Sequence, residues 1–243
     1  MRKLQSAVGL FVLTTSAASA TEYIYTTYDQ PFPLYTQLTS DNDQINSLGH
    51  TVAPATFEQN PLWPPHFFLG FSLHDGSVTT RVRSPWSGAF AWGTRINDRD
   101  QVVAQIGSAT FTSGLDTIDA AYFWDAGIFT VIRGRDIHIE DMNNLGQVVG
   151  AQDGGDILRK AIVWDRALPN SVQILSIPGV GGGGASVAEG ITDDGLIVGR
   201  YAAPQFNSPY RYFLATPVPE PTSRTLLGSG LLGLVGLRRK SRM

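Results

Sequence analysis

Four segments of the chain share one pattern of apolar and polar positions. Each begins with an apolar residue, continues through a polar turn of Asn, Asp, Ser and Gly, and ends in apolar, mostly β-branched residues. The segments start 51, 46 and 49 residues apart. They are Ile45–Ala53, Ile96–Ala104, Met142–Gly150 and Ile191–Gly199. The pattern predicts four β-hairpins, in which Asn143-Asn144 and Asp193-Asp194 serve turn geometry rather than calcium binding.

A second, aromatic strand is expected after each hairpin. These strands are Phe67–Leu73, Ala121–Asp125, Ala161–Asp165 and Tyr210–Leu214. Three of them are followed by an outer strand, at Ser77–Arg83, Phe129–Arg133 and Val172–Ile177. The fourth has no such successor, and the β-branched and aromatic stretch Glu22–Tyr28 is expected to supply it from the other end of the body.

The resulting fold class is all-β, with sixteen strands in four groups. A period of 40 to 50 residues is typical of propeller blades. We therefore expect a small four-bladed β-propeller closed by the N-terminal strand, since closure removes open sheet edges. An open stack with the same hairpins and no closure is the alternative.

Residues 1–20 have the features of a secretory signal peptide. Arg2 and Lys3 precede an apolar run, and the stretch ends in Ala18-Ser19-Ala20, a small-x-small cleavage pattern. We expect a signal helix here, export through the Sec machinery, and cleavage after Ala20.

Residues 218–243 differ in composition from the body. Pro219-Glu220-Pro221 is a rigid extended segment, because proline fixes its own φ and restricts its predecessor. Thirteen uncharged residues, Thr225–Leu237, predict a short transmembrane helix of about 20 Å, less than the roughly 30 Å hydrocarbon core. The chain then ends in a basic cluster expected to stay on the cytoplasmic side, formed by Arg238, Arg239, Lys240 and Arg242.

The order of tripeptide, Leu/Gly helix and basic tail closely resembles the PEP-CTERM sorting signal of Gram-negative bacteria. The resemblance implies recognition by an exosortase-type membrane transpeptidase, a transient inner-membrane anchor, and delivery to the cell surface or the exterior. An ordinary tail anchor is the alternative. The hairpins with their aromatic strands, best in Met142–Gly150 and Ala161–Asp165, resemble the HAF-type extracellular repeat, which implies an exported β body.

Removing both ends changes the charge of what folds. The whole chain carries 18 basic and 21 acidic residues and no cysteine. Residues 21–217 carry 11 basic and 20 acidic residues, a net charge of −9. An acidic body without a basic face is not a nucleic-acid binder, and the absence of cysteine excludes disulfides, thiol catalysis and zinc ribbons.

Candidate chemistry in the body is sparse. Gly70-Phe71-Ser72-Leu73-His74 departs from a nucleophile elbow in its last position and lies in an expected strand. The four histidines lack metal-ligand spacing, and the glycine run 179–184 leads into a hairpin rather than a helix. We expect no catalytic residue, no metal and no cofactor. The candidates for glycan or partner contact are Trp63, Phe67, Trp86 and Trp92.

The sequence therefore predicts three parts: a signal peptide at 1–20, a β domain at 21–217, and a sorting signal at 218–243. Its expected function is that of a non-enzymatic cell-surface or exopolysaccharide-matrix protein. The alternatives are a glycan-active hydrolase or lyase on a propeller, which would show carboxylates converging on the channel, and a protein-binding adhesion module.

Overall fold

A computed structural model of the chain describes residues 21–31, 33–34, 44–57, 68–87, 89–108, 117–133, 137–153, 158–180, 183–203 and 209–218. These ranges form fifteen strands in four antiparallel sheets. In the described ranges no helix is long and apolar enough to cross a membrane. The expected signal helix and the expected membrane helix at 225–237 both lie outside the described residues.

The first two sheets come from the N-terminal half of the body. The first contains β2 (Thr51–Phe57), β3 (Phe68–His74) and β4 (Thr79–Ser87), in that order. An isolated bridge between Ile45 and Thr51 marks the incoming arm of its hairpin. The second contains β5 (Ala89–Ile96), β6 (Val102–Ser108), β7 (Thr117–Asp125) and β8 (Ile128–Arg133).

The other two sheets have the same plan. The third contains β9 (His138–Met142), β10 (Gln147–Asp153), β11 (Arg159–Asp165) and β12 (Val172–Ile174). The fourth contains β13 (Ala185–Ile191), β14 (Ile197–Ala202), β15 (Arg211–Pro217) and, at its outer edge, β1 (Tyr23–Tyr28). The predicted hairpins, aromatic strands and outer strands are thus confirmed wherever they are described.

Strand β1 occupies the place that the sequence assigned to it. It pairs antiparallel with β15 along its whole length, from Tyr23 opposite Pro217 to Tyr28 opposite Tyr212. Tyr23 and Tyr25 pack against the core of the fourth sheet, and burial raises the pKa of Tyr23 to about 12. The prediction that the N-terminus completes the fourth sheet is confirmed.

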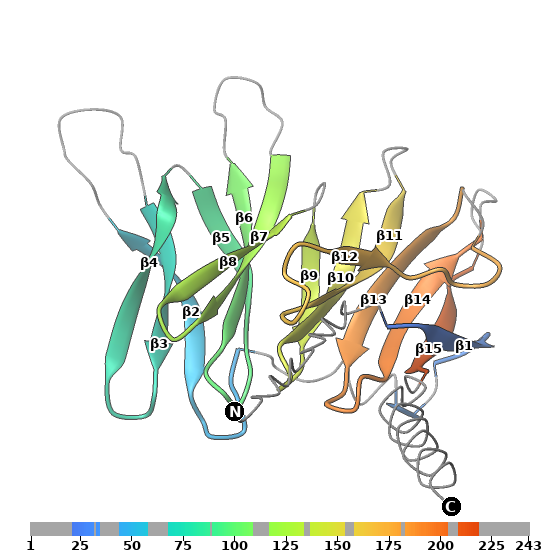
Figure 1. Ribbon diagram of the computed structural model, residues 1–243, viewed down its shortest axis with the longest axis horizontal. Coiled ribbons are helices and arrows are strands. Elements are labelled where there is room, and N and C mark those ends of the chain that lie inside the picture. Colours follow the sequence, from blue (N-terminus) through green and yellow to red (C-terminus); the bar gives the residue numbers. More distant parts are fainter. Residues whose placement is uncertain are drawn as a thin grey trace, which may run out of the picture.

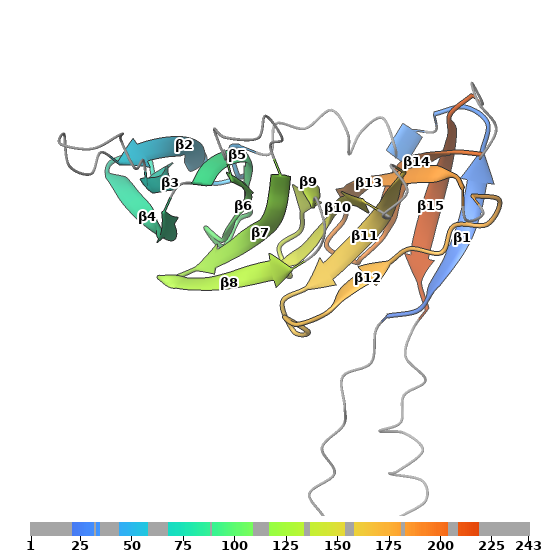
Figure 2. The ribbon, with the colours of Figure 1, turned by 90° about the horizontal axis from the view of Figure 1, so that it is seen from above.

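The sheets stand in an open row, so the expected closed propeller is wrong. Figures 1 and 2 show the sheet of β2–β4 at one end and the sheet of β13–β15 and β1 at the other. A physical reason lies in the outward face of the first sheet. Small or polar residues form a row across its three strands, with Ala53 opposite Ser72 and Ser72 opposite Arg81. Such a face is stable in water and needs no fourth sheet against it.

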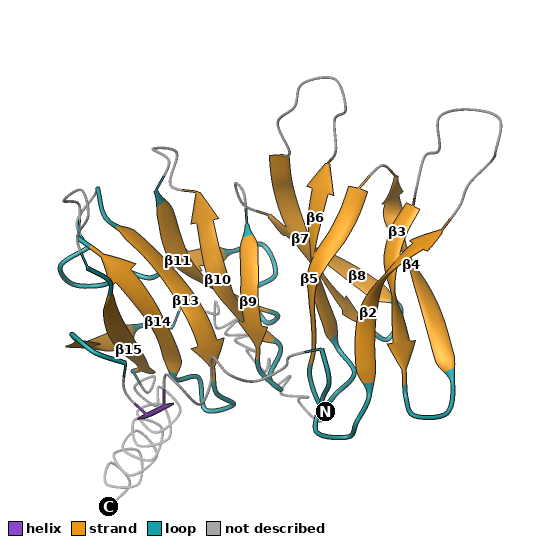
Figure 3. Cartoon of the chain, turned by 180° about the vertical axis from the view of Figure 1, so that it is seen from behind, coloured by secondary structure: helices purple, strands orange, loops and turns teal. Residues whose placement is uncertain are grey.

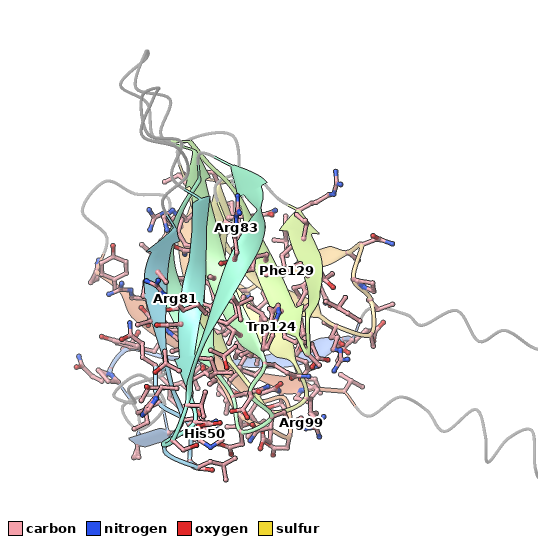
Figure 4. The ribbon with its side chains drawn as sticks, turned by 90° about the vertical axis from the view of Figure 1, so that its left-hand side faces the viewer. His50, Arg81, Arg83, Arg99, Trp124 and Phe129 are labelled. Carbon is pink, nitrogen blue, oxygen red and sulfur yellow. The ribbon has the colours of Figure 1, made fainter. Side chains whose placement is uncertain are left out.

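The core is divided into three layers between neighbouring sheets. Phe71 of β3 meets Trp124 of β7 edge to face at 5.3 Å between ring centroids, and Figure 4 shows Trp124 behind β4. Phe123 contacts Trp164 in the next layer at the same centroid distance. The inner sheets are buried on both faces, because successive residues such as Val102 and Val103 enter different layers. Stacking therefore replaces a single central core.

Candidate functional site

The four hairpin turns lie along one edge of the row, at the bottom of Figure 1, and equivalent side chains connect them. Asn46, Asn97 and Asn143 occupy the same position in the first three turns. The Oδ1 atom of each accepts two backbone N–H groups of its own turn, at 2.9–3.1 Å. This is the Asx-turn chemistry expected from the polar turns, and the prediction is confirmed.

The Nδ2 atom of each of these asparagines reaches the following turn. Asn46 donates to the carbonyl of Asn97 at 3.0 Å, Asn97 to that of Asn143 at 3.0 Å, and Asn143 to that of Thr192 at 2.9 Å. We call Asn46, Asn97, Asn143 and Thr192 the turn ladder. It ends at Thr192, because threonine has no amide to donate onward.

A second row of bonds runs beside the ladder. Backbone N–H groups of Ser47, Asp98 and Asn144 donate to the side-chain oxygens of Asp98, Asn144 and Asp193, at 2.7–2.8 Å. The hydroxyl and the backbone N–H of Ser47 lower the pKa of Asp98. The polar turn residues thus bind one another across the sheets.

A groove of about 530 Å³ crosses the four turns. Its polar lining consists of these turn residues and Asp141 of β9, with apolar residues such as Ile96 and Met142 beside them. Among the residues that the structure describes, no three acidic, histidine or cysteine side chains are grouped in a way that could hold a metal ion. Most polar atoms of the turn residues are used in hydrogen bonds within a turn or between the turns of neighbouring sheets.

A bulge lies three residues before the ladder position in β5, β9 and β13, each of which forms one edge of its sheet. The register shifts place Glu140 and Glu189 outside the regular pairing, and Thr94 lies in the equivalent irregular stretch. Bulges redirect side chains. Gly150 is needed opposite the bulge at Glu140, since a Cβ there would lie 1.9 Å from the carbonyl oxygen of His138.

The two glutamates have different electrostatic environments. Desolvation raises the pKa of Glu140, with a smaller contribution from Glu189, although Arg95 and other cations act in the opposite direction. The Nε atom of Arg95 donates to the backbone carbonyl of Glu140 at 2.9 Å. Glu189 is paired with Arg200 at 2.9 Å and its side chain is 14% exposed. Thr94 is fully buried, and its hydroxyl has no hydrogen-bond partner among the described atoms.

The candidates drawn from hydrolase patterns do not converge. Ser72 lies within β3, as expected, and its hydroxyl donates to the carbonyl of Ala53. His74 contacts the hydroxyl of Thr79 at 3.1 Å. His50 lies 2.7 Å from a carboxylate oxygen of Asp100, at the turn edge labelled in Figure 4. Burial lowers the pKa of His138.

The aromatic candidates cannot be placed as a group. Trp63 and Phe67 lie outside the described residues. Trp86 and Trp92 belong to β4 and β5 respectively, and only their backbones are described. Arg81 and Arg83 lie along β4 at the exposed end of the row, where Figure 4 labels them. The proposed glycan or partner contact therefore stays a prediction.

Both termini of the body lie at one corner of the fourth sheet, seen from behind in Figure 3. Beyond the last strand pair, the backbone N–H of Val218 donates to the carbonyl of Glu22 at 2.8 Å. The carbonyl of Thr21 accepts a hydrogen bond from the Nε2 atom of Gln173 at 2.7 Å. Thr21 follows the predicted signal cleavage point, and Val218 precedes Pro219 directly. Predicted residues that lie outside the described ranges are Ala18, Ala20, Pro219, Glu220, Pro221, Arg238, Arg239, Lys240 and Arg242.

Comparison with known families identifies the segment that starts at this corner. A family model of the PEP-CTERM protein-sorting motif matches residues 217–240. No curated protein and no solved structure matches the chain. The motif indicates an exported cell-surface protein that is sorted by an exosortase system. The predicted resemblance at the C-terminus is confirmed, whereas the HAF-type assignment stays a prediction.

Proposed function

We propose that the chain is a non-enzymatic surface or exopolysaccharide-matrix protein, whose β body is built from four HAF-type units. Export through the Sec machinery removes residues 1–20, and the segment 225–237 then holds the chain in the inner membrane until an exosortase-type enzyme releases it. The observation that carries the proposal is the sorting motif at 217–240, which begins where β15 ends. The polar side chains of the turns bind one another through the turn ladder, which supports a structural role for the body.

Replacement of Pro219-Glu220-Pro221 by three alanines tests this proposal. We expect a larger, uncleaved precursor in the inner-membrane fraction, because the enzyme loses its recognition segment. The matched control is Pro178→Ala, which changes an exposed proline between β12 and β13. Immunoblots of fractionated cells report size and location. An alanine variant with the mature size and location of the wild type refutes the proposal.

A glycan-active enzyme is the second candidate function, favoured by the bulged glutamates of β9 and β13. One carboxyl with a raised pKa and another held by a cation are the pair that general acid catalysis with a carboxylate partner requires. The test is release of reducing ends from the host's own exopolysaccharide by the wild type, Glu140→Gln and Glu189→Gln. Release by the wild type with loss in both variants establishes this function. Equal release by all three, or no release by the wild type, eliminates it.

A further inference from the structure

Strand β15 is paired on both of its edges as far as Ala215, and on its β1 side up to the start of the sorting motif. On one side it pairs with β14, from Ala215 opposite Ile197 to Arg211 opposite Tyr201. On the other side it pairs with β1, and the bond from Val218 to Glu22 extends this pairing past Pro217. The backbone just before the motif is therefore already occupied by the sheet.

Only Val218 separates the end of β15 from Pro219. Enzymes that bind peptides in an extended form commonly do so by adding them to a strand edge, which requires free backbone N–H and C=O groups. β14 and β1 flank residues 212–215, and β1 alone flanks Thr216 and Pro217, so the backbone before the motif offers few such groups while β1 is paired. A membrane enzyme would also meet a folded sheet one residue from its substrate.

Strand β1 is the element that can leave. It is the outermost strand of its sheet, and β15 is its one strand partner among the described residues. Ile24 is 63% exposed, so the strand packs against the core through one face only and its other face adds little buried area. Edge strands with one neighbour and few buried contacts open at lower free energy than inner strands.

We propose that β1 is a clasp on the sorting site, and that the exosortase-type enzyme acts on the chain while β1 is detached from β15. The proposal rests on the proposed sorting function. It makes the mature N-terminus a control element for processing at the C-terminus. Once the C-terminal segment has been removed, pairing of β1 completes the fourth sheet and closes the corner.

A disulfide lock across the two strands tests the clasp. Ile24 is opposite Thr216, both side chains are exposed, and the chain has no other cysteine. Facing residues of an antiparallel pair have Cα atoms about 4.5–5.5 Å apart, within the range that a disulfide accepts. Ile24→Cys with Thr216→Cys is expressed as full chain in a host with the cognate exosortase. Pulse-chase labelling then measures conversion to the mature size.

We expect the oxidised lock to slow processing about tenfold or more, and reductant to restore the wild-type rate. A matched lock, Ala53→Cys with Ser72→Cys, joins an equivalent pair in the first sheet and leaves the rate unchanged. Equal rates in the oxidised and reduced Ile24–Thr216 lock overturn the clasp. Equal slowing by both locks also overturns it. The alanine variant of the motif, run in parallel, shows separately whether sorting itself takes place.

A loosened clasp gives the opposite readout. Because Val218 bonds to Glu22, alternation along the pair directs the N–H of Thr26 toward β15 and that of Thr27 away from it. Thr26→Pro removes one inter-strand hydrogen bond and should speed processing about threefold. Thr27→Pro is the matched control and should leave it unchanged. Slower processing in Thr26→Pro, or the same rate in both variants, contradicts the proposal.

Discussion

Removal of one ladder side chain should destabilise the body far more than a typical surface substitution. Asn143 is 4% exposed, and its side chain makes four hydrogen bonds: it accepts from the N–H groups of Leu145 and Gln147 and donates to the side chain of Gln147 and the carbonyl of Thr192. In Asn143→Ala, partly buried backbone groups of this turn and of the next lose this partner. At about 0.5–1.5 kcal/mol net for each bond, the expected loss is about 3 kcal/mol.

Thermal and urea unfolding of the purified protein measure this loss. For a body of this size, about 3 kcal/mol corresponds to a fall in Tm of about 6–12 °C. The control Leu145→Ala truncates a side chain of the same turn that is 51% exposed, and should change stability by less than about 0.5 kcal/mol. Near-UV circular dichroism follows the packing of Trp164 and its neighbours during the transition.

The end of the ladder supplies a second control. Thr192→Asn restores an amide where no further turn follows, so its Nδ2 atom gains no carbonyl and stability should stay within about 0.5 kcal/mol of the wild type. A loss below about 1 kcal/mol in Asn143→Ala would show that the inter-turn bonds do not stabilise the row. A gain in Thr192→Asn comparable with the loss in Asn143→Ala would refute the assignment of Thr192 as the ladder's end.

Three other predictions follow from the sheets. Gly150→Ala should disrupt the bulge of β9 and cost about 2–4 kcal/mol in urea unfolding, because its Cβ would lie 1.9 Å from a backbone oxygen. The control is Ala151→Gly in the same strand as Gly150, which should cost about 1 kcal/mol. Glu140→Gln should stabilise the protein near pH 7 and lose that advantage below about pH 4. Burial raises the pKa of Glu140 in the folded state above its unfolded value, so ionisation of Glu140 lowers the stability of the wild type as pH rises between the two pKa values. The same stability difference between variant and wild type at both pH values argues against this cause. Deletion of residues 22–28 should remove hydrogen-exchange protection from the β15 amides that face β1, while the β15 amides that face β14 and the amides of β5–β8 stay protected. A uniform loss along the row would contradict the open arrangement.

The strand pattern could be predicted from the sequence because each strand had a local signal. Polar turns between β-branched runs located the hairpins, and the absence of an outer strand after Tyr210–Leu214 led to the correct partner for β1. Closure of the row had no such signal. It depends on how far each sheet rotates against the next and on the polarity of the end faces, neither of which a hairpin pattern contains.

The ladder and the bulges show the same limit at the level of side chains. The second residue of the segments is Asn at 46, 97 and 143, a visible regularity, and Thr192 replaces it in the last segment. The turn explanation of these residues was correct but incomplete, because bonds between turns appear only when the sheets are stacked. Glu140 and Glu189 gave no sequence signal, since a bulge is a register shift between two strands.

The turn ladder joins neighbouring sheets only, so the number of sheets in the row is not fixed by the need to close a ring. In a closed ring, the angle between neighbouring blades is set by the number of blades, so an added blade changes every interface in the ring. In this row each sheet bonds to the next through the same donor and acceptor, so a unit inserted between two sheets would find a matching neighbour on either side. The series ends at Thr192, in the turn of the last described sheet. Reach away from the sorting corner can therefore evolve by duplication of whole units, without remodelling any interface already present.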